Sequence, residues 1–206
     1  MADIISSDRK LRRRPLGDSA VTPASRAPDS ASDNSASLLP IVEMLFFAYR
    51  DFTGEADAVL EAYDLGRAHH RVLHFVNRQS GIRVAALLEL LKITKQSLGR
   101  VLRKLIEDGW IEQAPGPQDR RERRLTLTSK GRDLAAQLAR LQTQRIGAAL
   151  REVQADLGAG TDHDVEEHVR RFLLAMIARE ERAAVADIVE SGTSSSPKRS
   201  KREARE

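Results

Sequence analysis

The sequence of 206 residues contains no cysteine. This absence excludes disulfides, thiolate zinc sites, a cysteine nucleophile and thiol-based redox sensing in this chain, and it agrees with a reducing compartment. No run approaches the roughly 18 apolar residues of a membrane-spanning helix. The N-terminus mixes acidic and basic residues and has no apolar stretch of the kind that a secretory signal needs. We therefore expect a cytoplasmic protein without a membrane anchor.

The motifs of common enzymes are also missing. The sequence has no glycine-rich phosphate loop, no nucleophile elbow and no pair of carboxylates on an apolar background, so it does not favour catalysis. His70 and His74 have the i, i+4 spacing that can bind a metal on a helix. Further histidine ligands would have to come from His69, His163 and His168. No acidic residue completes a known metal motif around them, and Arg67 and Arg71 disfavour a cation, so we expect no metal, no cofactor and structural roles for these histidines.

Two polar segments flank one body that is rich in helix-forming residues. Residues 1–37 carry Ser, Asp, Ala, Arg and Pro without apolar periodicity, and residues 191–206 alternate in charge. Neither segment can bury enough apolar surface to offset its ordering entropy, so we predict a disordered arm and a disordered tail. Residues 38–190 form the folded body, for which the pattern predicts a mainly α fold with a small β-hairpin.

The body opens with an unusually apolar helix. Its stripe recurs at helical spacing through Leu38, Val42, Leu45, Tyr49 and Phe52, and neighbouring apolar residues widen it beyond one narrow face. A helix of this kind needs partners on more than one side. We predict that this helix breaks at Gly54, that a polar helical stretch follows over 55–64, and that another helix ends before Ser80.

The central segment predicts a helix-turn-helix. A short helix over about 84–91 is followed by a tight connection and a second helix, with Thr94 as N-cap and Gly109 just past its end. The second helix has an uninterrupted apolar stripe, formed by Leu98, Val101, Leu102, Leu105 and Ile106. The opposite face carries Gln96, Arg100 and Arg103, flanked by Ser97 and Lys104. Gln and Arg can read base edges in a major groove; an ordinary solvated helix pair is the alternative.

A charged hairpin follows directly. The segments WIEQA and RRERRLTLT alternate as strands around the turn sequence PGPQD, with Leu125 and Leu127 inward. From Lys92 to Arg132 there are eleven basic and five acidic residues, a net charge of +6, whereas the whole chain is +4 and the rest therefore sums to −2. A solvated charge run does not predict this concentration, which favours a DNA-binding winged helix-turn-helix over 66–132 with its wing at 110–128.

The segments ITKQSLGRVLRKLIEDGWI and GPQDRRERRLTLTSKG resemble the MarR family of winged-helix transcription regulators. The family's wing signature is matched by Asp119, Arg121, Leu125, Leu127, Thr128 and Gly131. The resemblance implies that Asp119 steadies the hairpin and that Arg121 enters the minor groove, while we assign Arg120 and Arg123 to phosphates. We expect the DNA contacts to come from Thr94, Lys95, Gln96, Ser97, Arg100, Arg103, Lys104, Arg120, Arg121 and Arg123.

The resemblance also implies a homodimer. In this family the first and last helices of two subunits interlock, which assigns residues 38–54 and 133–190 to dimerisation. The named interface residues are Leu38, Val42, Leu45, Tyr49, Phe172 and Met176. A dimer would place two recognition helices roughly 34 Å apart over an inverted repeat. The expected function is sequence-specific transcriptional regulation, as a repressor on family grounds, and a small-molecule effector in the inter-domain cleft is a hypothesis from the resemblance alone. An architectural DNA-binding protein without sequence preference is the alternative.

Overall fold

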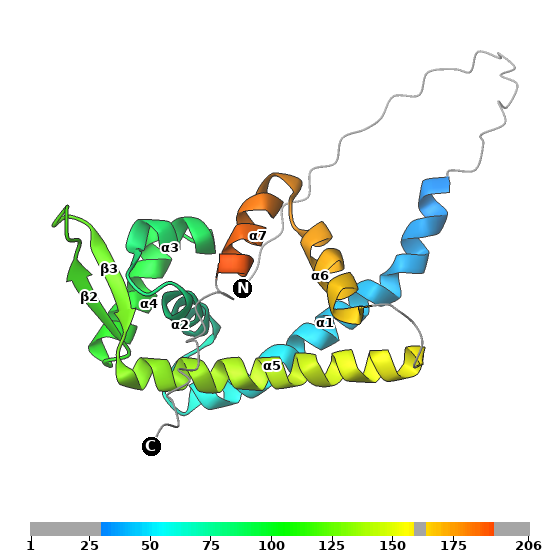
Figure 1. Ribbon diagram of the computed structural model, residues 1–206, viewed down its shortest axis with the longest axis horizontal. Helices are drawn as coiled ribbons and strands as arrows, with labels where there is room; N and C mark the ends of the chain where they lie inside the picture. The colour runs from blue at the N-terminus through cyan, green and yellow to red at the C-terminus, as the bar shows by residue number, and fades with distance from the viewer. Residues whose placement is uncertain (1–29, 159–163, 192–206) are drawn as a thin grey trace, which may run out of the picture. The chain divides into compact units, whose positions relative to one another are not determined.

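The computed structural model describes residues 30–158 and 164–191 (Figure 1). Among these residues, the part before Met44 and the part from Met44 onward belong to two separate units. Most of the predicted arm and tail, residues 1–29 and 192–206, lies outside the described residues. The expected fold class is confirmed: the described chain is mainly helical with one small antiparallel sheet.

The first helix is longer than the sequence pattern predicts. Helix α1 spans Ser30–Glu61, so it begins inside the segment 1–37 that was assigned to the arm. Adding residues to an existing helix costs much less free energy than nucleating a new helix. The helix formed by the apolar stretch can therefore extend toward the N-terminus. The predicted break at Gly54 is wrong, because α1 continues through it. Thr53, Ala56 and Leu60 are buried on the same helix, and that burial outweighs the cost of about 1 kcal/mol for a helical glycine.

Three helices and a short strand build the helix-turn-helix region. Helix α2 spans Arg67–Arg78, and strand β1 (Ile82–Arg83) leads into α3 (Val84–Leu91) and α4 (Lys95–Glu107). The predicted bounds of α3 and the predicted N-cap of α4 are confirmed, since the Thr94 hydroxyl accepts a hydrogen bond from the Ser97 amide at 3.1 Å. Gly109 follows α4 with a φ of 72°, the left-handed conformation that glycine tolerates.

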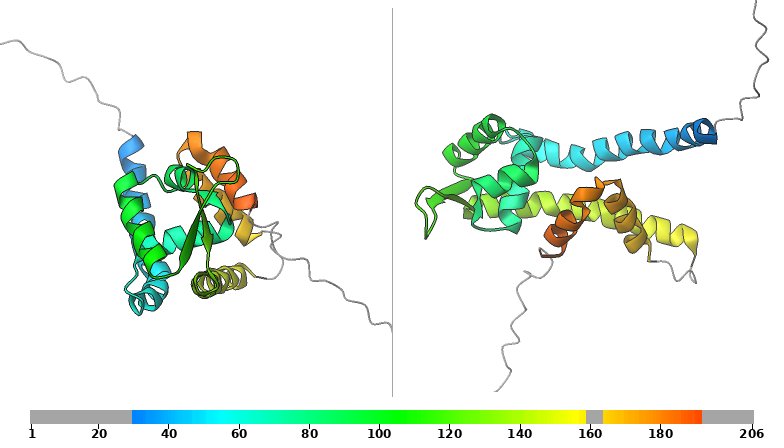
Figure 2. Two further views of the ribbon diagram at one scale, coloured as in Figure 1. Left: turned by 90° about the vertical axis from the view of Figure 1, so that its left-hand side faces the viewer. Right: turned by 90° about the horizontal axis from the view of Figure 1, so that it is seen from above.

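The wing is a three-stranded antiparallel sheet in the order β1–β3–β2. Strand β2 (Ile111–Pro115) and strand β3 (Arg123–Leu127) form the predicted hairpin, which extends away from the helices (Figures 1 and 2). The pairing of Ile82 with Leu125 adds β1, which the sequence pattern did not predict. Leu125 and Leu127 are buried as the alternation requires, so the charged side chains of β3 stay near the surface.

The C-terminal part contains three further elements of helical structure after α5. Helix α5 spans Ser129–Leu157, and α6 (Val165–Met176) is followed by a 3-10 turn η1 (Arg179–Glu181) and α7 (Arg182–Ser191). The sequence pattern did not predict α7 as a separate helix. The chain becomes extended at Ile177, where ψ is 145°, and the Arg182 guanidinium donates a hydrogen bond to the Ile177 carbonyl at 2.9 Å. This interaction satisfies a carbonyl that the end of α6 leaves free.

One hydrophobic core holds α4 and the wing together. Leu73 of α2, Leu87 of α3, Leu98 of α4, Leu125 of β3 and Leu138 of α5 are essentially fully buried in it. Because α4 turns its apolar stripe into this core, its polar face is left at the surface.

The junction between wing and α5 is unusually close. A Cβ on Gly131 would lie 2.1 Å from the Trp110 carbonyl oxygen, so only glycine allows this approach. The Thr128 hydroxyl accepts from the Gly131 amide at 3.0 Å and donates to the Gly109 carbonyl at 2.8 Å. The end of α4, both edges of the hairpin and the start of α5 therefore meet in one hydrogen-bonded turn.

We expect opposite effects from alanine at two glycines. Gly131→Ala should lower the free energy of unfolding by about 1–3 kcal/mol, because the Trp110 backbone must move. Gly54→Ala should raise it by about 0.5–1 kcal/mol, because Gly54 lies inside a helix and its added Cβ meets no described atom within 4 Å. Urea unfolding at one fixed protein concentration measures both. A Gly131→Ala protein as stable as the wild type would contradict the close junction.

Candidate nucleic-acid interface

Helix α4 presents a polar surface opposite the core. Gln96, Arg100 and Arg103 are exposed on it, together with Lys95 at its first turn. These side chains share one helix face and are free of the core, which is the arrangement that base reading requires. Thr94 and Ser97 also lie at this end of the helix. Their hydroxyls are joined by a hydrogen bond of 2.9 Å, so both already take part in the N-terminal cap of α4.

Lys104 differs from the other predicted contacts. Its ammonium group lies 2.9 Å from an Asp64 carboxylate oxygen and 3.2 Å from one of Asp108. The hydrogen bond with Asp64 is the main cause that raises the pKa of Lys104, followed by that with Asp108. A phosphate contact by Lys104 would have to compete with these two carboxylates. Asp64 is distant in sequence, so the helical wheel gave no sign of this interaction.

The tip of the wing is closed by hydrogen bonds around Asp119. Its carboxylate accepts from the Arg121 amide at 2.8 Å, and its carbonyl accepts from the Glu122 amide at 3.1 Å. A Cβ on Gly116 would lie 2.8 Å from the Asp119 carbonyl oxygen, so glycine is required here as well. These contacts hold Arg121 at the end of a fixed turn rather than on a free loop.

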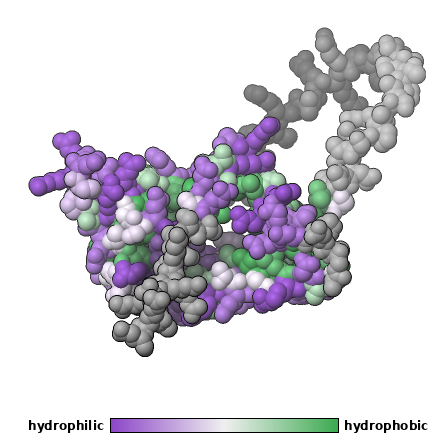
Figure 3. Space-filling view, in the orientation of Figure 1, coloured by the Kyte–Doolittle hydropathy of each residue, from purple (hydrophilic) through white to green (hydrophobic). Residues whose placement is uncertain are grey.

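The charges of the wing are divided into paired and unpaired groups. The Glu122 carboxylate, just before β3, lies 3.3 Å from the guanidinium of Arg83 on β1 and 3.3 Å from that of Arg124. It is therefore already paired with two cations. Arg120, Arg121 and Arg123 are exposed, and among the described residues no ion pair links any of the three to a carboxylate. The wing tip is accordingly hydrophilic in the space-filling view (Figure 3).

Arg83 is a member of this region that the sequence pattern did not reveal. It reaches the wing only because β1 pairs with β3, and the register places Arg83 opposite Arg124. A strand of two residues is too short to show an alternating pattern, so it cannot be predicted from the local sequence. Arg123 is also constrained, since its guanidinium donates to the Arg120 carbonyl at 2.9 Å.

Comparison with known proteins identifies the family to which these elements belong. A model of the MarR family matches residues 63–122, which include α2, α3, α4 and part of the wing. The HTH-type transcriptional regulator PetP of Rhodobacter capsulatus is 49% identical over 119 residues, covering 58% of this chain and 72% of that protein. The chain belongs to the MarR family. Its class follows from this membership: it is a DNA-binding transcriptional regulator.

Solved structures of MarR-type proteins have the same fold. The RV1404 protein of Mycobacterium tuberculosis is 21% identical with a TM-score of 0.53, covering 72% of this chain and 95% of that one. A MarR transcriptional regulator of Methanosarcina mazei Go1 is 22% identical with a TM-score of 0.51, covering 66% of this chain and 91% of that one. At these identities the likeness concerns the fold, and the residue contacts must be argued from this chain.

The residues that the MarR resemblance assigns to dimerisation leave apolar surface uncovered. The side chains of Leu38, Val42, Tyr49, Phe172 and Met176 are between 43% and 57% exposed, whereas Leu45 is half-buried. Beside Phe172, an apolar groove of about 500 Å³ runs between the end of α5 and α6. None of the helices in residues 30–158 and 164–191 is long and apolar enough to span a bilayer.

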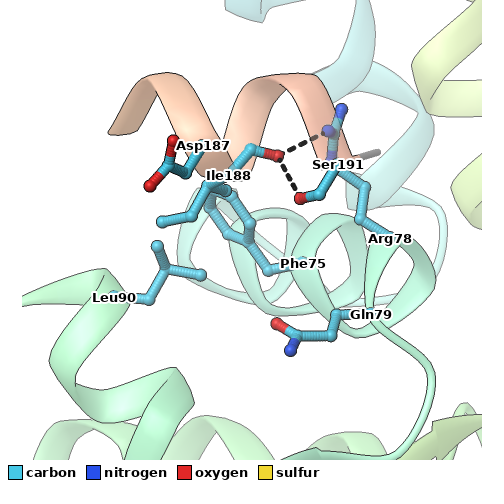
Figure 4. Close-up of a pocket in the computed structure, with 7 residues that line it drawn as sticks. All are labelled: Phe75, Arg78, Gln79, Leu90, Asp187, Ile188 and Ser191. Carbon is cyan, nitrogen blue, oxygen red and sulfur yellow. Dashed lines mark hydrogen bonds between the residues drawn. The ribbon is translucent and has the colours of Figure 1, made fainter. Parts of the chain in front are cut away.

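A separate cavity of about 400 Å³ lies between α2, α3 and α7 of this MarR-family chain (Figure 4). Phe75 and Leu90 give it apolar walls. At its edge, Arg78 donates hydrogen bonds to the carbonyls of Ile188 and Val189 at 3.0 and 2.9 Å. The guanidinium thus ties the end of α7 to α2, at the place where the DNA-binding helices meet the C-terminal helices.

His70 and His74 lie on α2 and are half-buried. Burial is the main cause that lowers the pKa of each, and Arg78 lowers that of His74 further. Both rings are therefore neutral near pH 7. In the part of the chain that the structure describes, no three His, Asp or Glu residues gather in a way that could hold a metal.

The carboxylate of Asp119 should decide how well the wing tip is ordered. We expect Asp119→Ala to speed hydrogen exchange of the wing amides and to weaken DNA binding about tenfold, because a charge-assisted bond to the turn is lost. Asp119→Asn keeps a neutral acceptor, so its wing exchange rates and its DNA affinity should lie between those of the wild type and Asp119→Ala. Exchange of the α4 amides serves as the internal control, and unchanged exchange at the wing in Asp119→Ala would remove this role from Asp119.

Proposed function

We propose that this MarR-family chain acts as a homodimer that reads an inverted repeat in double-stranded DNA. In each subunit α4 enters the major groove, where Gln96 and Arg100 contact base edges, and the wing brings Arg121 to the neighbouring minor groove. The observation that carries the proposal is the exposed polar face of α4 beside a hairpin whose tip is fixed and positively charged. Arg120 and Arg123 act on phosphates, and Lys95 and Arg103 extend the basic surface along α4.

Dimerisation is supported by the apolar surface outside the DNA-binding region. Phe172 and Met176 lie one helical turn apart on α6, and both are about half exposed. An isolated chain with such surface is expected to bury it against a partner. A two-fold axis would then relate two copies of α4, so that the DNA site is an inverted repeat with centres about one turn apart.

Regulation is proposed to be repression with control by a small ligand. A dimer bound over an operator excludes other DNA-binding proteins from it, which is the simplest way for a bound regulator to lower transcription. The cavity beside Arg78 is our candidate for the ligand site, because it combines apolar walls with a guanidinium and the Asp187 carboxylate, which suits an aromatic compound with polar groups. Such a ligand would compete with the contact between Arg78 and α7, and so act on α2 and α3 next to the DNA-reading helix.

The second candidate is an architectural protein that binds DNA without reading its sequence. The basic wing alone would suffice for that function, because phosphate contacts carry no sequence information. Gln96 and Arg100 separate the two candidates by experiment, because base contacts by these side chains make affinity depend on sequence and phosphate contacts do not. Selecting bound duplexes from a random pool tests the proposal: an enriched inverted repeat supports it, and strong binding without any enriched motif favours the architectural role.

Arg100 should carry discrimination between sequences. We expect Arg100→Ala to weaken binding to the selected duplex by about 1–3 kcal/mol while changing binding to a scrambled duplex much less. Fluorescence anisotropy with both duplexes at one salt concentration measures the difference. Equal losses on the two duplexes would contradict base reading by Arg100.

Arg120→Ala and Arg123→Ala provide the contrasting case. Each should weaken binding to both duplexes by a similar factor and reduce the slope of log affinity against log salt by about 1, because one phosphate contact is lost. Titrations at several salt concentrations give the slope. A slope identical to the wild type in both variants would remove these arginines from the phosphate contacts.

The combined substitutions Phe172→Glu and Met176→Glu should disrupt the dimer. Interface positions of this kind can each contribute 2 kcal/mol or more, so the double variant should dissociate roughly a thousandfold more readily. Sedimentation velocity at micromolar concentration should then show a folded monomer. Gln113→Glu, on exposed β2, adds negative charge elsewhere and should leave the association unchanged; a double variant that remains dimeric would place the interface on other surfaces.

A further inference from the structure

Gly99 lies in the middle of α4, yet the fold does not require a glycine there. Gly131 is forced by the Trp110 carbonyl, and Gly109 is needed for its positive φ. By contrast, Gly99 has no positive φ, and a Cβ built on it would meet nothing among the described residues within 4 Å. Glycine is the least favourable residue in a helix interior apart from proline. Alanine at this position would therefore serve the helix better, so the missing side chain needs another explanation.

The surroundings of Gly99 supply that explanation. Gly99 lines a groove of about 560 Å³ between α3, α4 and the wing. The walls of the groove are mainly apolar and include Leu88 and Leu98, whereas Lys95 of α4 and Arg121 of the wing contribute cationic groups. Glu122 also lines the groove, and its carboxylate is paired with Arg83 and Arg124. A groove with apolar walls and cations on two sides suits a chain of deoxyribose rings joined by phosphates, because each part meets its chemical complement.

The geometry of duplex DNA sends one strand through this groove. The major and minor grooves alternate along the duplex, and a single sugar–phosphate strand separates neighbouring grooves. If α4 occupies the major groove and the wing tip the adjacent minor groove, the strand between those grooves must pass between α4 and the wing. This step rests on the proposed function.

We infer that the groove receives this sugar–phosphate strand and that Gly99 is the point of its closest approach to α4. The bare backbone at Gly99 lets a deoxyribose ring lie against the helix, with Lys95 and Arg121 on the phosphates to either side. Gly99 is thus a positioning residue, against which the strand rests between α4 and the wing. Because the strand is the same in every sequence, its contribution does not depend on the bases.

The inference is tested with Gly99→Ala and Gly99→Leu in the full-length chain, using the selected duplex and its scrambled counterpart. Both variants should melt at the wild-type temperature or a few degrees higher, because glycine is removed from a helix. Affinity should fall about tenfold for alanine and roughly a hundredfold for leucine. The fall should be the same on both duplexes, unlike that of Arg100→Ala.

Gly66→Ala is the matched control. Gly66 also has no described atom within 4 Å of an added Cβ, its φ of −139° suits any residue, and it does not line the groove. Its substitution should leave DNA affinity unchanged.

Each other outcome is decisive. If the wild type prefers the selected duplex but both Gly99 variants bind DNA with unchanged affinity, the inference is overturned. A loss confined to the selected duplex would put a base edge, not the strand, against Gly99. A lower melting temperature would show that the fold itself needs this glycine. If the wild type binds the selected and scrambled duplexes alike, the proposed function fails instead.

Discussion

The approach of Gly131 to the Trp110 carbonyl is the constraint on which the DNA-facing surface depends. Helix α4 ends at Glu107, the hairpin of the wing runs from Ile111 to Leu127, and α5 starts at Ser129. The Thr128 side chain joins these segments by bonds to Gly109 and Gly131, and the Lys130 ammonium lies 3.7 Å from the centre of the Trp110 ring. Helix α4, the wing and the long helix α5 are thereby fixed to one another. A reader of two adjacent grooves needs this rigidity, since an error of about 1 Å in placing a binding group is costly.

The charge of this surface depends on which carboxylates are already engaged. Glu122 lies between Arg83 and Arg124, and Asp64 and Asp108 hold Lys104. These three acidic side chains are thus paired with neighbouring cations, while the arginines of the wing tip remain without carboxylate ion pairs in the described part of the chain. Exposed ion pairs of this kind contribute little to stability. Their main effect is electrostatic. By neutralising these carboxylates, they leave the surface around the wing basic while the rest of the chain has a lower net charge.

Elements with a strong local signal could be predicted from the sequence, and elements made by distant contacts could not. The regular stripe from Leu98 to Ile106, with Thr94 before it and Gly109 after it, specified α4 almost to the residue. The alternation around Leu125 specified the hairpin. Strand β1 escaped prediction because two residues carry no period, and its pairing with β3 joins segments about 40 residues apart. The break expected at Gly54 reflected propensity alone, whereas burial of Ala56 and Leu60 decided the outcome. The pairing of Lys104 with Asp64 and the docking of α7 through Arg78 are likewise tertiary contacts that no local pattern reports.

We propose that one subunit occupies a major groove with α4 and the neighbouring minor groove with its wing. Chemical footprinting on the selected duplex tests this most directly, with dimethyl sulfate probing guanine N7 in the major groove and hydroxyl radicals probing the sugars. We expect two patches of N7 protection about one turn apart, each flanked by protected sugars on its outer, minor-groove side, in a two-fold symmetric pattern. Protection of sugars alone, spread evenly along the duplex and without protected N7 positions, would contradict it.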